Sequence, residues 1–237
     1  MLMPHVSKPI AVIAGTGPGI GAALARRFAA DYELVLLARQ QLTLDTVAEE
    51  VEGSHSYVCD LSDSASVANA FAAIRRDVGQ VDTLLYNAGQ GLFQDVESTT
   101  AAQFEKLWQV NALGAFLCVQ EVMPAMKAAG SGNIIFTGAT ASVRGGANTA
   151  AFASAKAAQR SLAESLAKAL WPAGIHVALV VVDGVVDTPR TRARMAGKPD
   201  EFFVSPRGVA ETMYGLCRQD KSAWSFQVEA RPFGERW

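Results

Sequence analysis

The stretch IAVIAGTGPGIG, residues 10–21, decides the fold that this sequence predicts. Its first six residues form a short apolar run that ends in glycine, which is typical of a strand buried on both faces of a parallel sheet. The glycines that follow permit a tight turn, and a helical pattern starts at about Ile20. A strand, a glycine-rich turn and a helix in this order predict the start of a βαβ unit.

Apolar runs and helical patterns alternate along the rest of the chain. The expected strands cover residues 10–15, 33–39, 56–60, 81–89, 133–138, 175–184 and 224–230, and the expected helices cover about residues 20–30, 44–51, 64–77, 101–128, 152–170 and 207–218. Continuous apolar strands separated by helices favour a parallel sheet that is covered on both faces. Right-handed crossovers then give a doubly wound order. We therefore expect an α/β fold, a three-layer Rossmann fold that forms a single domain over residues 1–237.

Residues 188–203 interrupt the alternation with proline, glycine and mixed charges. In a doubly wound sheet this segment would lie beyond the carboxyl end of a strand, where ligands bind. We therefore expect a surface excursion that acts as a substrate lid. Its basic residues Arg190, Arg192 and Arg194 could meet cofactor phosphates or an acidic substrate, or they could form a solvated helix face.

The composition argues against several other classes of function. Of the 237 residues, 50% are hydrophobic, and the formal net charge is −2, so neither nucleic acid nor an anionic membrane is expected as a partner. No apolar run is long enough to span a bilayer, and the N-terminus lacks a cleavable signal pattern, so we expect a cytoplasmic protein. Three separated cysteines without CxxC spacing predict neither a disulfide framework nor a metal site, and Cys59 and Cys118 lie in apolar contexts that predict burial.

The turn between the first strand and the first helix also predicts a ligand. Glycine lets a pyrophosphate approach the main chain, and the helix N-terminus offers free N–H groups and the positive end of a dipole. A glycine-rich turn that binds nothing is the alternative, but the strand before it and the helix after it favour a phosphate site. The residues expected to hold a dinucleotide here are Gly15, Thr16, Gly17, Gly19, Ile20 and Gly21.

The end of the second expected strand, Leu37-Ala38-Arg39, indicates which dinucleotide binds. An NAD site usually carries an acidic residue there to hold the ribose 2′-hydroxyl, and none is present. The planar fork of Arg39 can pair instead with a 2′-phosphate, although a solvent-facing arginine is the alternative. The missing acid favours NADP(H) over NAD(H).

Several motifs, taken in order, resemble those of the short-chain dehydrogenase/reductase family over essentially the whole chain. They are residues 14–21, similar to TGxxxGxG; Asp60-Leu61; Asn87-Ala88-Gly89, similar to NNAG; Asn111; and Gly184-x-Val186-x-Thr188, similar to PGxVxT with Asp183 where proline is usual. The resemblance implies that Asp60 and Leu61 contact adenine and that the 184–188 segment touches the nicotinamide carboxamide. It also places Asn87, Ala88 and Gly89 in the cofactor site.

The resemblance further implies a reaction, hydride transfer between the nicotinamide and a carbonyl or alcohol carbon. In the family a tyrosine hydroxyl handles the proton, a lysine four residues later holds the nicotinamide ribose, a serine thirteen residues before the tyrosine bonds the substrate oxygen, and an asparagine supports a relay water. The corresponding residues here are Phe152, Lys156, Ala139 and Asn111. Loss of the general acid alone should cost about two to four orders of magnitude in rate.

Other residues near the expected cleft are candidates to replace the two missing hydroxyls. Thr140 and Ser142 could polarise a carbonyl, or they could only cap a turn. Arg144 could bind an anionic substrate or assist protonation through its charge, or it could be a surface arginine. Lys156 could itself donate a proton, directly or through water held by Asn111.

Two functions fit these residues best. The first is an NADP(H)-dependent oxidoreductase with a non-standard active site that acts on a small carbonyl, enone or imine substrate. The second is a catalytically silent NADP(H)-binding sensor or partner subunit. A structural protein with a vestigial site is a third reading, and the intact cofactor motifs argue against it. From the resemblance we also expect a dimer or tetramer held by the helices near residues 101–128 and 152–170.

Overall fold

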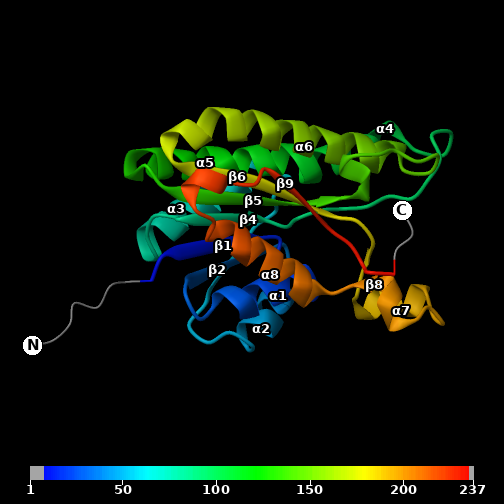
Figure 1. Ribbon diagram of the computed structural model, residues 1–237, viewed down its shortest axis with the longest axis horizontal. Coiled ribbons are helices and arrows are strands. Elements are labelled where there is room, and N and C mark those ends of the chain that lie inside the picture. Colours follow the sequence, from blue (N-terminus) through cyan, green and yellow to red (C-terminus); the bar gives the residue numbers. More distant parts are fainter. Residues whose placement is uncertain (1–7, 235–237) are drawn as a thin grey trace, which may run out of the picture.

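A seven-stranded sheet forms the centre of the computed structural model, which describes residues 8–234 (Figure 1). Residues 1–7, on which part of the N-terminal prediction falls, and residues 235–237 lie outside the described chain. The strands are β1 (Ile10–Ala14), β2 (Glu33–Ala38), β3 (His55–Val58), β4 (Thr83–Tyr86), β5 (Gly132–Ala139), β6 (Ile175–Val182) and β9 (Gln227–Ala230). They pair in parallel in the order β3-β2-β1-β4-β5-β6-β9, which is doubly wound because the order reverses between β1 and β4.

Helices cover both faces of this sheet, as Figure 1 shows. The helices are α1 (Ile20–Phe28), α2 (Gln41–Ala48), α3 (Ser64–Asp77), α4 (Ala101–Trp108), α5 (Gly114–Ala129), α6 (Ala150–Leu170) and α8 (Pro206–Cys217). The first core cluster joins one face of the sheet to α3, α5 and α6, and the second joins the other face to α1, α2 and α8. The expected α/β three-layer fold is confirmed.

The central strands are apolar on both sides because each lies between two helical layers. All eight residues of β6, which reads IHVALVVV, are buried. Successive side chains of a strand point to opposite faces. Val177 and Leu179 accordingly belong to the first core cluster, and Ala178 and Val180 belong to the second. β6 pairs with β5 along its whole length, so its carboxyl end at Val182 lies beside Ala139.

The helix expected over residues 101–128 is interrupted, which corrects the sequence analysis. A π-helical turn, Gln109–Leu113, lies between α4 and α5. Tyr86 reaches it from the end of β4 and donates its hydroxyl hydrogen to the carbonyl of Val110 at 2.5 Å. One wide turn hardly changes the spacing of apolar residues around it, so periodicity does not reveal it. π-helical turns often mark functional sites, and this one contains the fully buried Asn111.

Residues 188–203 contain ordered elements that the sequence analysis did not predict. They are the short helix α7 (Pro189–Arg194), the 3₁₀ turn η4 (Asp200–Phe202) and the strand β8 (Phe203–Val204), which pairs in parallel with β7 (Val185–Val186). Thr188 begins α7 by accepting a hydrogen bond from the Thr191 amide. The two ends of the excursion are therefore joined by main-chain hydrogen bonds.

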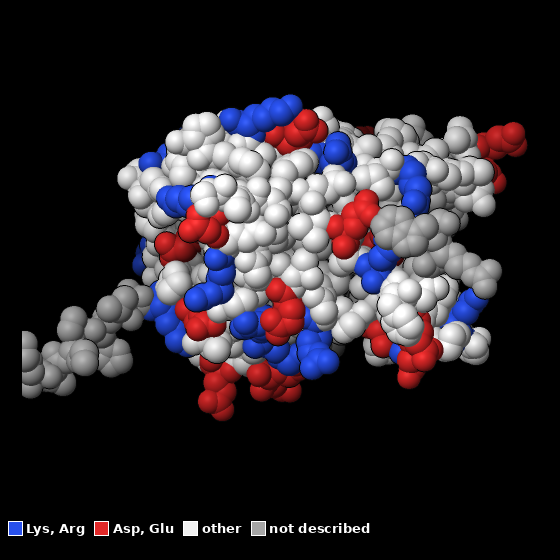
Figure 2. All heavy atoms as spheres, in the orientation of Figure 1, with Lys and Arg blue, Asp and Glu red and all other residues white. Residues whose placement is uncertain are grey.

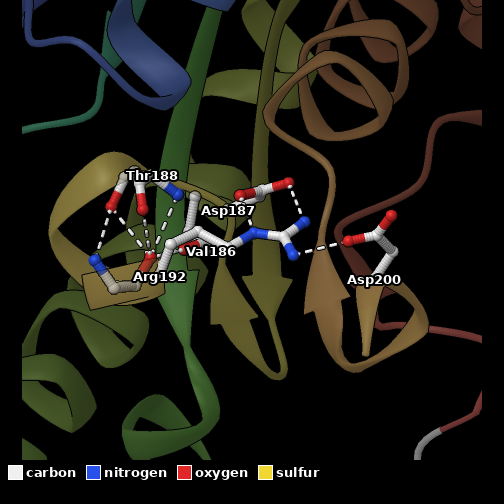
Figure 3. Close-up of polar contacts among 6 residues, drawn as sticks. Val186, Asp187, Thr188, Arg192 and Asp200 are labelled. Atoms are coloured by element: carbon white, nitrogen blue, oxygen red, sulfur yellow. Dashed lines mark hydrogen bonds and ion pairs between the residues drawn. The ribbon is translucent and has the colours of Figure 1, made fainter. Parts of the chain in front are cut away.

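Arg192 joins the parts of this excursion through its side chain (Figure 3). Its Nε and Nη2 atoms each donate to the Asp187 carboxylate at 2.7 Å, and its Nη1 donates to Asp200 at 2.6 Å. The guanidinium also lies over the ring of Phe203, 4.1 Å from its centroid. Of the three arginines in the segment, this one is therefore held inside the excursion.

Charged side chains are mixed on the surface, and two of the cysteines are buried as their apolar contexts predict. On the face drawn in Figure 2, acidic and basic side chains are interspersed. The three cysteines are free thiols, and Cys59 and Cys118 are buried. Among residues 8–234, no helix combines the length and the apolar character that a bilayer crossing requires.

Gly114, the first residue of α5, tests the packing of that helix against the sheet. A Cβ atom there would lie 2.2 Å from the carbonyl oxygen of Leu61 and 2.6 Å from the Tyr86 hydroxyl, so Gly114→Ala should lower the free energy of unfolding by about 2 kcal/mol or more. Gly215, exposed in α8, is the matched control because a Cβ there meets no atom within 4 Å. Gly215→Ala should be neutral or stabilising by up to about 1 kcal/mol. Chemical denaturation measures both, and equal effects would contradict the packing described.

Candidate active site

A cavity of about 700 Å³ opens at the carboxyl ends of β1, β4, β5 and β6. Doubly wound sheets bind their ligands at this edge. Its walls are mostly apolar, and they come from the strand ends, from the N-terminal turns of α6, and from the excursion at Thr191, Arg194 and Met195. The cavity is large enough for part of a dinucleotide together with a small substrate.

The glycine loop after β1 has the shape of an anion cradle. Gly15 has a φ of 102°, and a Cβ there would lie 2.3 Å from the main-chain nitrogen of Ala88. Gly17 faces open space, with no atom within 4 Å of a Cβ position. No side chain caps the N-terminus of α1 at Gly19. Its first N–H groups therefore have no side-chain cap, which is the condition that the predicted phosphate site requires.

Asn87 ties this loop to the neighbouring strands. Its Nδ2 donates to the carbonyl of Gly15 at 2.8 Å, and its Oδ1 accepts from the Thr137 hydroxyl at 3.0 Å. The main-chain nitrogens of Asn87 and Ala88 both donate to the carbonyl of Ala14. The carboxyl ends of β1, β4 and β5 are thus joined through one side chain.

Arg39 and Asp60 lie near each other at the carboxyl ends of β2 and β3. Arg39 is exposed directly after β2. The Asp60 carboxylate accepts hydrogen bonds from the amide and the hydroxyl of Ser62, which lower its pKa, and the charge of Arg39 lowers that pKa further. Leu61 is buried, with its carbonyl against Gly114. The residues that directly follow β2 are Arg39 and Gln40, and neither is acidic.

The 184–188 segment lies over the glycine loop. Gly184 has a φ of 154°, and a Cβ there would come within 2.7 Å of Val204. Val186 lines the cavity, and the methyl group of Thr188 lies 2.9 Å from the Cβ position of Gly19. The structure therefore brings residues 184–188 into contact with the glycine loop of residues 14–21.

Lys156 is buried at the base of the cavity, with a relative exposure of 4%. Its Nζ donates to the carbonyl of Thr137 at 2.9 Å and to Oε1 of Gln159 at 3.1 Å. Both acceptors are neutral, and burial lowers the Lys156 pKa from 10.5 to about 8. An ammonium carries three N–H groups, so one remains for a ligand in the cavity.

Gln159 is a residue of the site that sequence reasoning missed. It is fully buried, it accepts from Lys156, and its Nε2 donates to the main-chain carbonyl of Asn111 at 2.9 Å. The Asn111 amide is held in turn by the carbonyls of Gln90 and Leu107. The available signal was a long polar side chain three residues after Lys156, on the same side of an alanine-rich helix.

Phe152 and Ala139 both line the cavity. The Phe152 ring packs against Phe93, with the centroids 6.0 Å apart. The main-chain nitrogen of Ala139 donates to the hydroxyl of Ser142, which is buried and forms part of the turn after β5. Of the two hydroxyl candidates, Ser142 thus caps a turn, and Thr140 lines the cavity.

Thr140 and Arg144 share one partner, the buried carboxylate of Asp183. The Thr140 hydroxyl donates to Asp183 Oδ1 at 2.5 Å, and Arg144 Nη2 donates to both carboxylate oxygens at 3.1 and 3.0 Å. A hydroxyl that gives its hydrogen to a carboxylate does not offer it to a substrate. Arg144 lines the cavity, so it is neither a purely solvated arginine nor a free cation.

Comparison with known families agrees with this geometry. A model of the short chain dehydrogenase family matches residues 9–199. The chain belongs to the short-chain dehydrogenase family. The 3-oxoacyl-[acyl-carrier-protein] reductase MabA of Mycobacterium tuberculosis is 34% identical over 190 residues, which cover 80% of this chain and 74% of that protein. Levodione reductase of Leifsonia aquatica is 30% identical over 216 residues, covering 85% and 77%.

Solved structures of other short-chain dehydrogenases share the fold over nearly the whole chain. A metagenomic short-chain oxidoreductase in complex with NADP superposes with a TM-score of 0.84 at 28% identity, covering 97% of this chain and 99% of that one. An alcohol dehydrogenase from Thermococcus sibiricus complexed with 5-hydroxy-NADP gives a TM-score of 0.86 at 26% identity, covering 97% and 99%.

The lowered Lys156 pKa predicts a specific pH dependence of stability. Between about pH 8 and 10.5 the unfolded chain holds a proton on Lys156 that the native chain has lost, so the free energy of unfolding rises with pH in this window. Relative to Lys156→Met, wild-type stability should increase by about 3 kcal/mol from pH 7.5 to 10.5. Urea unfolding at several pH values measures the difference, and a difference independent of pH would show that Lys156 keeps its ordinary pKa.

Proposed function

We propose that this chain is an NADP(H)-dependent oxidoreductase with a non-standard active site, which transfers a hydride to or from a small carbonyl, enone or imine substrate. The supporting observation is that Ile20, at the end of the open phosphate cradle, and the buried Lys156 line one cavity, whereas the positions of the usual tyrosine and serine carry Phe152 and Ala139. The enzymes to which the chain is similar are reductases and dehydrogenases of its family.

The proposed cofactor is NADP(H). When bound, it would supply or accept the hydride. The residues proposed to hold it are Gly15, Thr16, Gly17, Gly19, Ile20, Gly21, Arg39, Asp60, Leu61, Asn87, Ala88, Gly89, Lys156, Gly184, Val186 and Thr188. Support comes from the uncapped N-terminus of α1 and the open space at Gly17, which leave room for a diphosphate. Exposed Arg39, with no acid beside it at the end of β2, favours the 2′-phosphate, and solved relatives carry NADP or its derivative.

Lys156 is proposed to handle the proton. A general acid works best when its pKa is close to the working pH, and the pKa of about 8 meets that condition. Thr137 and Gln159 hold the Nζ atom in place, and one N–H group stays available for the ribose or the substrate oxygen. Asn111 is proposed to support this arrangement, since its carbonyl receives the Gln159 amide.

A catalytically silent NADP(H) binder is the second candidate. The observation that favours it is the surface that the cavity presents at Phe152 and Ala139, which carries no acidic hydrogen. The Thr140 hydroxyl donates its hydrogen to Asp183, and Ser142, which accepts from the Ala139 amide, is buried in its turn and is not part of the cavity lining. Cofactor binding without turnover would support this candidate.

The excursion and the outer helices suggest two further properties. Residues 188–203 are proposed to act as a lid, because α7 and the residue after it reach the cavity wall. Self-association is proposed through α4 and α5, where Phe104, Trp108 and Phe116 are 44%, 43% and 40% exposed. Leu107, Val119 and Leu170, apolar residues of the faces expected at an interface, are instead buried in this chain's own core.

Fluorescence titration with NADPH and NADH tests the cofactor assignment. NADPH should bind more tightly than NADH, and Arg39→Gln should weaken NADPH binding about tenfold or more while leaving NADH nearly unchanged, because it removes charged hydrogen bonds to the 2′-phosphate. Arg26→Gln, at an exposed position of α1, is the control and should change neither affinity. If neither nucleotide binds, the cofactor site is vestigial and both proposed functions fail.

Turnover separates the enzyme from the silent binder. Ketones, aldehydes, enones, imines and quinones are screened with NADPH by its absorbance, and slow or selective oxidation is expected. Phe152→Tyr with Ala139→Ser should raise the rate on simple ketones about a hundredfold, because the pair restores a general acid beside Lys156. If wild type turns over no substrate class while the double variant does, the silent binder is the better description.

A further inference from the structure

The charged residues that line the cavity share one sign. They are Arg144, Lys156 and Arg194, and no Asp or Glu of residues 8–234 is part of the lining. Apolar walls and charges of one sign focus the electric field in a cleft and attract ligands of the opposite charge. The chain as a whole is slightly acidic, so this positive cavity is a local property of the site.

Arg144 is the cation among these that a buried carboxylate holds in place. Its Nη2 atom donates to both oxygens of Asp183, whose side chain is only 2% exposed, whereas the Arg144 side chain is 57% exposed. Within the described chain its Nε and Nη1 donate no hydrogen bond. One edge of the guanidinium is therefore anchored, and the other N–H groups are available to a ligand.

Asp183 has two further polar partners besides Arg144. Arg231 lies 2.8 Å from its Oδ2, with a side chain only 12% exposed, and the Thr140 hydroxyl donates to its Oδ1. Arg231 also pairs with Glu229, so its charge is shared between two carboxylates and Arg144 contributes to balancing Asp183. Arg144 makes this contact through Nη2 alone while it lines the cavity.

Other parts of the lining of this cavity are apolar and partly aromatic. Phe152 and Phe93 pack together there, and Met195 of the excursion also contributes to the lining. A ligand of this cavity would therefore need an apolar body as well as a negative group. The N–H groups of Arg144 that Asp183 leaves free lie on Nε and Nη1, and each can donate a charge-assisted hydrogen bond to a carboxylate.

We propose that Arg144 recognises a carboxylate on the substrate, so that the enzyme acts on an acid whose apolar body lies against Phe152 and Phe93. Asp183 is the positioning residue that orders the guanidinium before the substrate arrives. This inference rests on the proposed function, because it concerns the substrate half of the same cavity. Asp183 occupies the position where proline is usual in the family, and it would give this chain its preference for a carboxylate by holding Arg144.

Binding of two isosteric probes tests this inference without turnover. Benzoate and benzamide are titrated by calorimetry into the protein with saturating NADP⁺ and without it. Wild type should prefer benzoate by about tenfold or more, and Arg144→Gln should abolish this preference while leaving the affinity for benzamide unchanged. Arg144→Lys should retain part of the preference, because lysine keeps the positive charge but lacks the planar guanidinium group.

Two matched variants keep the test specific. Arg190→Gln, at an exposed position of α7 outside the cavity lining, should leave the preference for benzoate intact. Arg194→Gln should reduce it less than Arg144→Gln does, because Arg194 lacks the anchoring carboxylate. Melting temperatures near that of wild type, expected because Asp183 keeps Arg231 and Thr140, would show that Arg144→Gln is folded.

The outcomes separate this inference from the proposed function. Equal affinity of wild type for the two probes, no binding of benzoate, or an undiminished preference in Arg144→Gln would overturn it. A preference that disappears in Arg194→Gln but persists in Arg144→Gln would overturn it as well. The NADPH titration does not depend on the benzoate experiment. Tight NADPH binding together with any of these results would therefore refute carboxylate recognition by Arg144 and leave the proposed oxidoreductase function unaffected.

Discussion

The side-chain amide of Asn87 is the constraint on which the rest of the site depends. It bonds the carbonyl of Gly15 on one side and the hydroxyl of Thr137 on the other, while the Thr137 carbonyl receives Lys156. From Lys156 the network continues through Gln159 to the π-helical turn. These hydrogen bonds use two of the three N–H groups of Lys156, and together they hold the glycine loop and α6 in a fixed relation.

This network contains no carboxylate, and that explains the electrostatics of the cavity. Lys156 is stabilised by neutral oxygens alone, which is why burial shifts its pKa towards neutrality instead of being offset by a countercharge. The carboxylate of Asp183 lies behind the lining, where Arg231 and Thr140 occupy it. The acidic group of the site therefore serves to orient a cation and does not cancel the field inside the cavity.

Much of the fold could be predicted from the sequence because continuous apolar strands and glycine turns are local signals. The helix α3 was predicted with its observed bounds, residues 64–77, and the strands were placed within a few residues. The π-helical turn was missed because it leaves the apolar spacing almost unchanged. Gln159 was missed because its partners lie on other elements. The roles of Thr140 and Ser142 depended on hydroxyl directions, which sequence spacing does not contain.

The parallel pairing of β7 with β8 makes the excursion over the cavity a closed module. The first and last residues of the module are hydrogen-bonded to each other, and Arg192 connects Asp187 with Asp200 inside it. A structural change within residues 187–202 should therefore have little effect on the central sheet. Changes in the length of such a segment cost little free energy of folding, because its ends are already held together and the entropy of loop closure grows only slowly with loop length. Residues 189–202 can therefore change in sequence while the central sheet stays unaltered.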